Sequence, residues 1–146
     1  GGDIFMKRLL PIFKASFFVP LFGDGSTKFQ PVFIDDVSLA INQIINTEIT
    51  GKNIYELAGP RIYSYKEFFN HISNFLNKTR VLVPVPMGVM KPMINIAEKT
   101  PISPLTSEQL MLFEKDNLAV NVDKSLENLD INPQDTLQVL KNIVVN

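Results

Sequence analysis

Short β-like runs are scarce in this chain, and their scarcity limits the fold more than any other feature of the sequence. About four extended, largely apolar runs can be picked out, at residues 17–22, 28–34, 53–58 and 80–85. Helical spacing of apolar residues accounts for about six further segments. A complete doubly wound parallel sheet has about six strands. The sequence therefore predicts an α/β, mixed α+β fragment with few short strands and about six helices, forming a single domain over residues 1–146.

Turn and capping residues predict several boundaries. Residues 23–27, which are rich in glycine and small polar side chains, are typical of a β-hairpin turn between residues 17–22 and 28–34. Asp35 or Asp36 is expected to N-cap the helix that follows. Ser64 is followed at the third position by a glutamate, and this capping-box spacing predicts a helix that begins there.

Composition excludes several classes of function. The 14 basic and 15 acidic residues nearly cancel, which argues against a nucleic-acid partner because such a protein needs a basic surface. The chain has no cysteine and one histidine, so we expect no thiolate or multi-histidine metal site. No apolar run approaches the ~18–20 residues that cross a bilayer, so no transmembrane segment is expected.

The common nucleotide-binding and dehydrogenase motifs are missing from the sequence. Lys28 follows the glycines of residues 23–27, but a phosphate loop needs Gly-Lys-Ser/Thr ahead of a helix, so a hairpin turn is the better interpretation. The dinucleotide fingerprint Gly-x-Gly-x-x-Gly does not occur. Tyr-x-x-x-Lys is also missing, because the tyrosines are followed four positions later by Gly59, Glu67 and Phe69. We therefore predict no catalytic residue and no cofactor-binding residue in this chain.

Three further patterns have both a structural and a functional interpretation. Asp35 and Asp36 can cap a helix or act as paired carboxylates, and capping is favoured. His71 borders an apolar helix face and is expected to be non-catalytic. The methionines of residues 87–93 recur at helical spacing, which indicates first a core or interface stripe and second the lining of a hydrophobic ligand channel.

Two longer motifs resemble a known family. Residues 29–40 read Phe-Gln-Pro-Val-Phe-Ile-Asp-Asp-Val-Ser-Leu-Ala, and residues 51–60 read Gly-Lys-Asn-Ile-Tyr-Glu-Leu-Ala-Gly-Pro. They resemble the C-terminal half of extended and atypical short-chain dehydrogenases, the NAD-dependent epimerase/dehydratase superfamily. Motifs at residues 29–32, 83–86 and 104–109 are similar to the branch that contains the NAD(P)H-binding accessory subunit of respiratory complex I, NADH:ubiquinone oxidoreductase.

The resemblance implies the C-terminal, substrate-side part of a Rossmann-like protein, whose N-terminal nucleotide-binding Rossmann half is absent from this chain. In the family, the NAD(P)H site and the catalytic Tyr and Lys precede this segment, so NAD(P)H is implied for the full-length parent only. The complex I branch implies a non-catalytic accessory protein with complex I subunits as partners. It also implies a place on the matrix side of the mitochondrial inner membrane, or on the cytoplasmic side of a bacterial one.

Two other functions stay open. The chain can be the substrate-binding half of an NAD(P)-dependent epimerase, dehydratase or reductase, in which case its parent is an enzyme. It can also be a stand-alone protein-interaction module. An upstream glycine fingerprint with Tyr-x-x-x-Lys would favour the enzyme, and a fingerprint with a degraded Tyr/Lys pair would favour the accessory subunit.

The candidate substrate-binding residues lie where the resemblance implies the rim of a cleft: Lys28, Gln30 and Arg61. Lys28 and Arg61 can donate hydrogen bonds to anionic oxygens, and Gln30 can pair with hydroxyls or amides. Plain solvent exposure is the competing interpretation for each of them.

The absence of a Rossmann half also predicts self-association. Its removal uncovers apolar area, and large apolar patches rarely stay exposed on monomers. Two copies of the chain are expected to meet through residues 17–19 and through the apolar face of the opening helix, formed by Phe5, Leu9, Ile12 and Phe13.

We predict that this chain alone binds neither NADH nor NADPH. A pyrophosphate needs a glycine-rich turn at a helix N-terminus, and the sequence has none of that pattern. Calorimetric titration with each nucleotide is expected to show no saturable heat, with a nucleotide-binding dehydrogenase as the positive control. A micromolar or tighter dissociation constant would contradict the prediction.

Overall fold

The computed structural model describes residues 4–47, 51, 53–100, 105–120 and 125–145. The chain divides into two compact units, each built from two segments that are distant in sequence. The first unit contains Gly1–Lys28 and Ser64–Asp116, and the second contains Phe29–Tyr63 and Asn117–Val144. The expectation of a single domain is not tested by this division and stays a prediction.

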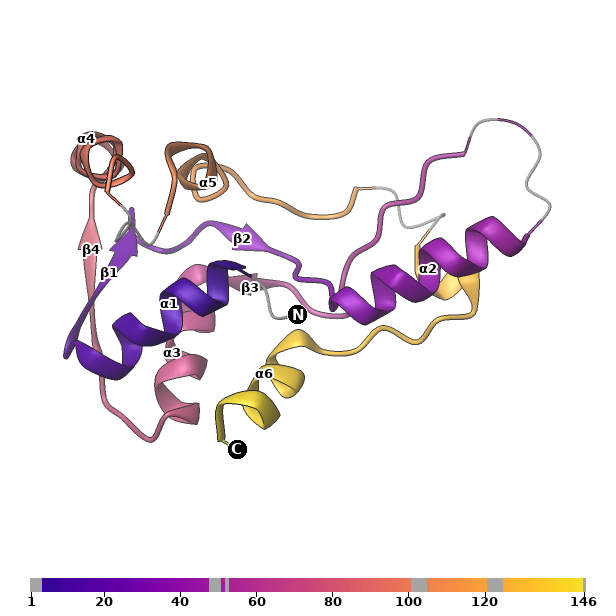
Figure 1. Cartoon of the computed structure of the whole chain (residues 1–146), viewed down its shortest axis with the longest axis horizontal. Helices are drawn as coiled ribbons and strands as arrows, with labels where there is room; N and C mark the ends of the chain where they lie inside the picture. The colour runs from indigo at the N-terminus through magenta and orange to yellow at the C-terminus, as the bar shows by residue number, and fades with distance from the viewer. Residues whose placement is uncertain (1–3, 48–50, 52, 101–104, 121–124, 146) are drawn as a thin grey trace. The chain divides into compact units, whose positions relative to one another are not determined.

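Helices dominate both units (Figure 1). The first unit contains α1 (Ile4–Ala15), β1 (Phe18–Phe22), α3 (Tyr65–Phe75), β4 (Val81–Val85), α4 (Met87–Ala97) and α5 (Ser107–Met111). The second contains α2 (Ile34–Asn46), the 3-10 turn η2 (Glu127–Leu129) and nearly all of α6 (Thr136–Val145). The chain passes between the units within two short strands that pair with each other, β2 (Lys28–Phe29) and β3 (Tyr63–Ser64).

This content confirms the predicted mixed α/β class with few short strands. Across the described ranges, no helix has the length and apolar character needed to cross a membrane.

The predicted β-hairpin between residues 17–22 and 28–34 is wrong. Strand β1 pairs in parallel with β4, and the register runs from Phe18 opposite Val81 to Phe22 opposite Val85. The glycine-rich turn exists, with positive φ at Gly23 and Gly25, but it docks on the start of α3. There the backbone N–H of Lys66 donates to the Gly25 carbonyl at 3.1 Å. The turn therefore contacts α3 while the chain continues into β2, and β1 pairs with a strand that is more distant in sequence.

Aromatic side chains form much of the core of the first unit. Phe13 of α1 meets Phe69 of α3 edge to face, with ring centroids 5.3 Å apart. Phe22 of β1 and Tyr65 of α3 both pack on Phe113, at 3.9 and 4.3 Å between centroids. Such ring pairs stabilise a core beyond their buried area. They tie the two sequence segments of this unit together.

The opening helix uses most of its predicted contact residues inside its own unit. Leu9 and Phe13 are buried, and Ile12 is half-buried. The side chain of Phe5 lies outside the part of the chain that is described. Phe17 and Phe18 are exposed, as expected for residues of a docking surface, but Val19 is buried. Self-association itself stays a prediction.

Two helix starts are set by reciprocal capping boxes. The Ser64 hydroxyl accepts from the Glu67 backbone N–H, and the Glu67 carboxylate accepts from the Ser64 backbone N–H at 2.8 Å. The predicted start of α3 is thus confirmed. Thr106 and Gln109 form the same arrangement at the start of α5.

The prediction that Asp35 or Asp36 N-caps α2 is wrong. The N-cap residue is Phe33, which provides no side-chain hydrogen bond. Asp36 lies inside the first turn, 1% exposed, and its carboxylate accepts from the Gln134 backbone N–H at 2.7 Å and from Gln134 Nε2 at 3.2 Å. It therefore joins α2 to the chain just before α6. Beside this link, Ala40 of α2 packs with Leu126 and Leu129 in the core of the second unit.

We predict that Asp36→Ala destabilises the second unit by about 1–3 kcal/mol, because it leaves partly buried donors of Gln134 without an acceptor. The matched control is Asp35→Ala. Asp35 is exposed in the same first turn, so its loss removes only a helix-dipole contribution of about 0.3–1 kcal/mol. Urea unfolding followed by circular dichroism measures both free energies. Equal losses in the two variants would contradict a special role for the Asp36 link.

Candidate functional site

Three extended segments of the second unit surround an open hollow of about 510 Å³. They are residues 29–32, 56–58 and 117–120, and we call the space between them the three-segment hollow. The sequence predicts a strand at residues 53–58, and this prediction is wrong, because these residues form neither strand nor helix. Its connections to the neighbouring segments are made largely by side chains.

Gln30 is the centre of these connections. Its Nε2 donates to the Gly59 carbonyl at 2.8 Å, and its Oε1 accepts from the Ala119 N–H at 3.3 Å. Its own backbone N–H donates to the Asn117 carbonyl at 3.1 Å. Glu56 makes a similar link, since its carboxylate accepts from the Val120 N–H at 2.6 Å. One amide side chain therefore holds all three walls of the hollow.

Gly59 allows the closest approach between two of these segments. A Cβ at this position would lie 2.0 Å from the Pro31 carbonyl oxygen, which no side chain tolerates. The bare backbone of Gly59 thus lets the chain after residues 56–58 lie directly on residues 29–32. This local contact explains why a glycine stands at the end of the run that resembles the family motif.

Arg61 pairs with a carboxylate of the same unit. Its Nε lies 3.3 Å from Asp135 Oδ2, while its side chain stays 66% exposed. The other carboxylate oxygen, Oδ1, accepts from the Tyr63 hydroxyl and from the Leu137 backbone N–H, each at 2.9 Å. Asp135 therefore contacts Arg61, Tyr63 and the first turn of α6 with one carboxylate. Sequence reasoning missed Asp135, although an aspartate directly before an apolar helical run is an N-cap signal.

The pKa of Tyr63 is raised to about 12. Burial is the largest cause, followed by its hydrogen bond to Asp135 and the negative charge of that carboxylate, whereas Arg61 acts in the opposite direction. Burial also raises the pKa of Tyr65 to about 12. Both phenols are neutral near pH 7, and the Tyr63 hydroxyl stays available as a donor to Asp135.

The structure distributes the predicted site residues over different surroundings. Gln30 and Arg61 belong to the second unit, and they contact different partners. Lys28 belongs to the first unit, where its backbone N–H donates to Asp116 Oδ1 at 2.8 Å and its side chain is exposed. Gln30 is a positioning residue of the hollow, because both ends of its amide are bound to backbone groups. Arg61 is the charged one of the two predicted residues in the second unit, and its side chain is 66% exposed.

The other candidate patterns have structural explanations. Met90 is buried and lines a small apolar cavity of about 50 Å³, which is too small for an organic ligand, whereas Met93 is exposed. The core interpretation of the methionine stripe is thus supported for Met90. His71 is exposed and lies near the Phe75 ring. Among residues that the structure describes, no group of three or more acidic or histidine side chains is placed to hold a metal ion.

Sequence comparison finds relatives in respiratory complex I. No family model matches the chain. The chain is 32% identical over 106 residues to NADH dehydrogenase [ubiquinone] 1 alpha subcomplex subunit 9, mitochondrial, of Arabidopsis thaliana. It is 28% identical over 109 residues to the NADH-ubiquinone oxidoreductase 40 kDa subunit, mitochondrial, of Neurospora crassa. The alignments cover 68% and 74% of this chain but 26% and 29% of those relatives.

Comparison of folds finds reductases. Triphenylmethane reductase of Citrobacter sp. matches 97% of this chain with a TM-score of 0.69 and 16% identity, and this chain covers 48% of it. The dTDP-4-dehydrorhamnose reductase of Bacillus anthracis, solved in complex with NADP, matches with a TM-score of 0.57 and 16% identity, and 42% of it is covered. The predicted resemblance to a complex I subunit in sequence, and to part of a Rossmann-like reductase in fold, is thereby confirmed.

We predict that Asp135→Asn lowers the pKa of Tyr63 from about 12 while leaving it above 10, because burial remains after the charged acceptor is removed. The pKa of Tyr65 should not change, since burial alone raises it. Ultraviolet absorbance of tyrosinate measures both, with Tyr63→Phe to assign the signal. Asparagine still caps α6, so the helix start is preserved.

The same shift fixes how stability depends on pH. The folded state holds the Tyr63 proton up to about pH 12, whereas the unfolded chain releases it near pH 10. The stabilisation is therefore fully present below pH 10 and is lost as the pH rises through 12. Asp135→Asn should make this alkaline loss of stability smaller, and an unchanged profile would contradict the contact.

Proposed function

We propose that this chain is the C-terminal, substrate-side segment of a non-catalytic NAD(P)H-binding accessory protein of respiratory complex I. The observation that carries the proposal is the sequence similarity to two complex I subunits over about 70% of the chain. The fold supports it as well, because the chain covers slightly less than half of two reductases whose structures match it. The nucleotide would then be held by a half of the parent that precedes this segment.

The second unit carries surface features that suit such a missing half. Helix α2 has one apolar stripe in the core and a second, exposed stripe of Ile34, Ile41 and Ile45. These three residues recur at seven- and four-residue spacing, which places them on one side of the helix. A helix that is apolar on two sides is normally covered on both. Residues 53–58 join no strand ladder, as expected for a segment whose sheet neighbour belongs to the rest of the parent.

The relatives' names also bear on location. Both matched subunits are mitochondrial by name. We therefore place the parent beside the membrane that carries complex I, on the matrix side in a mitochondrion or on the cytoplasmic side in a bacterium. Its partners there would be complex I subunits.

An enzyme is the second candidate, and the fold match to reductases favours it. In that case this chain is one wall of the substrate cleft of an NAD(P)-dependent epimerase, dehydratase or reductase. Within the second unit, Arg61 would then meet anionic oxygens of the substrate, and Gln30 would shape the wall through its bonds to Gly59 and Ala119. Upstream sequence with an intact Tyr-x-x-x-Lys pair would distinguish this function from the accessory role.

We predict that the full-length parent, tagged and isolated from its own host, migrates with complex I on native gels and stains there for NADH oxidation. The isolated parent should bind NADPH yet leave it unoxidised when sugar-nucleotide or keto substrates are added. The untagged strain is the control for nonspecific capture. Migration as a free species that turns over such a substrate would contradict the accessory role and favour the enzyme.

A further inference from the structure

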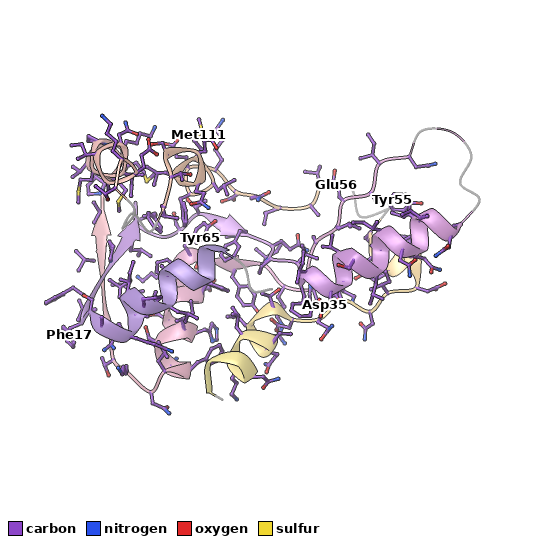
Figure 2. All side chains as sticks on the ribbon, viewed as in Figure 1. Phe17, Asp35, Tyr55, Glu56, Tyr65 and Met111 are labelled. Carbon is purple, nitrogen blue, oxygen red and sulfur yellow. The ribbon has the colours of Figure 1, made fainter. Side chains whose placement is uncertain are left out.

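Two exposed phenylalanines project from one end of the first unit. Phe17 and Phe18 lie where α1 passes into β1, and they are 52% and 60% exposed. Their rings meet edge to face with centroids 5.1 Å apart. Phe18 stands opposite Val81, the exposed first residue of β4. Figure 2 shows the Phe17 side chain pointing outward from the ribbon, away from α1 and β1. We call Phe17, Phe18 and Val81 the aromatic tip.

Basic side chains border the aromatic tip. Lys78 Nζ donates to the Lys14 carbonyl at 3.0 Å, and Arg80 Nε donates to the Phe13 carbonyl at 2.6 Å. These acceptors are backbone carbonyls at the C-terminal end of α1, where the helix dipole is negative, so they hold the two cations in place. They carry no formal charge, so the region keeps its formal positive charge. The side chain of Lys14 itself is exposed. Lys14 therefore lies three residues before Phe17, and Lys78 and Arg80 lie within three residues of Val81, which pairs with Phe18.

No carboxylate balances these cations nearby in the sequence. Residues 4–22 and 76–86, which include the tip and its basic border, contain no aspartate or glutamate. The ion pairs found in the described ranges, Arg61 with Asp135 and Lys91 with Glu114, involve other residues. The chain as a whole carries a net charge of −1, so this end is locally opposite in sign to the molecule.

We propose that the aromatic tip is a contact site for an anionic lipid surface. Phe17 and Phe18 would enter the boundary between headgroups and acyl chains, and Lys14, Lys78 and Arg80 would meet lipid phosphates. The rings protrude, whereas a rigid protein partner would need a matching hollow to bury them. A bilayer interface accommodates protruding rings without such a hollow. The proposal is independent of the function proposed above, because it involves neither nucleotide nor complex I.

A tryptophan probe tests this directly, because the chain contains no tryptophan. Phe17→Trp places a single tryptophan at the tip, and Met111→Trp places one on the exposed end of α5 as a matched control. Each protein is mixed with vesicles of phosphatidylcholine alone, or with one third phosphatidylglycerol. We expect a blue shift, and quenching by brominated acyl chains, for Trp at position 17 with anionic vesicles only. A missing shift, or an equal shift at position 111, overturns the proposal.

Co-sedimentation with the same anionic vesicles measures the contributions of ring and charge. Phe17→Ser should weaken binding about tenfold, since a half-exposed ring no longer leaves water. Lys14→Gln should weaken it about fivefold, because it removes one cation near the surface while its backbone carbonyl still accepts from Lys78. Lys115→Gln, an exposed residue of the same unit with the same charge change, is the control and should bind like the unaltered chain.

Two further outcomes would also overturn the proposal. The first is equal binding to neutral and anionic vesicles, which would exclude a role for the basic border. The second is a blue shift of the tryptophan at position 17 that grows with protein concentration in the absence of vesicles. That result would show that the tip meets a second copy of the chain. Circular dichroism of Phe17→Ser and Lys14→Gln confirms that their helices are retained.

Discussion

The second unit depends on one amide side chain for the arrangement of its walls. Gln30 uses its donor for the Gly59 carbonyl and its acceptor for the Ala119 N–H, so three separate segments meet at one residue. A backbone ladder would normally make such connections, and each polar backbone group left unpaired inside a protein is costly. Here side-chain hydrogen bonds take the place of most backbone-to-backbone bonds between the segments. Gly59 lets two of the segments approach closely enough for these side-chain bonds to form. The three-segment hollow remains open because side chains, and not a continuous backbone ladder, join its walls.

The two units differ in how completely they bury their own apolar residues. In the first unit, α1, β1 and α3 each bury an aromatic ring in a shared core, and these rings are Phe13, Phe22 and Phe69. In the second unit fewer apolar residues are buried, and the cluster of Ala40, Leu126 and Leu129 is bordered by apolar side chains that are only partly covered. This difference agrees with a proposed parent in which the second unit packs on a further half.

The sequence predicts an element correctly where the interactions that form it involve residues close together in the chain. The Ser64–Glu67 capping box and the strand at residues 80–85 depend on neighbours within a few residues, and both were predicted correctly. The partner of β1 was not, because the same apolar alternation permits pairing with a nearby or a distant strand. Asp36 was misassigned for a related reason, since a carboxylate near a helix start satisfies the capping pattern whether it faces its own helix or Gln134. For Gln30, residue type indicates an amide that can donate and accept, and the fold shows that it bonds to the backbone of Gly59 and Ala119, while contact with a substrate stays a prediction.

The electrostatics of Arg61 decide how the proposed site could meet an anion. The Asp135 carboxylate pairs with Nε of the Arg61 guanidinium and so orients it. That carboxylate is itself held in place by hydrogen bonds from the Tyr63 hydroxyl and from the backbone at the start of α6. A guanidinium has five N–H donors, so an arginine fixed through Nε can still present its terminal nitrogens to a second acceptor. The 66% exposure of the side chain leaves room for one.

Lys28 differs from Arg61 because its contact with Asp116 is made by its backbone N–H, so this contact does not orient its ammonium group. A preorganised cation loses less conformational entropy on binding than a mobile one. On this physical ground Arg61, held by Asp135, is a better candidate than Lys28 for contact with an anionic group of a substrate or partner.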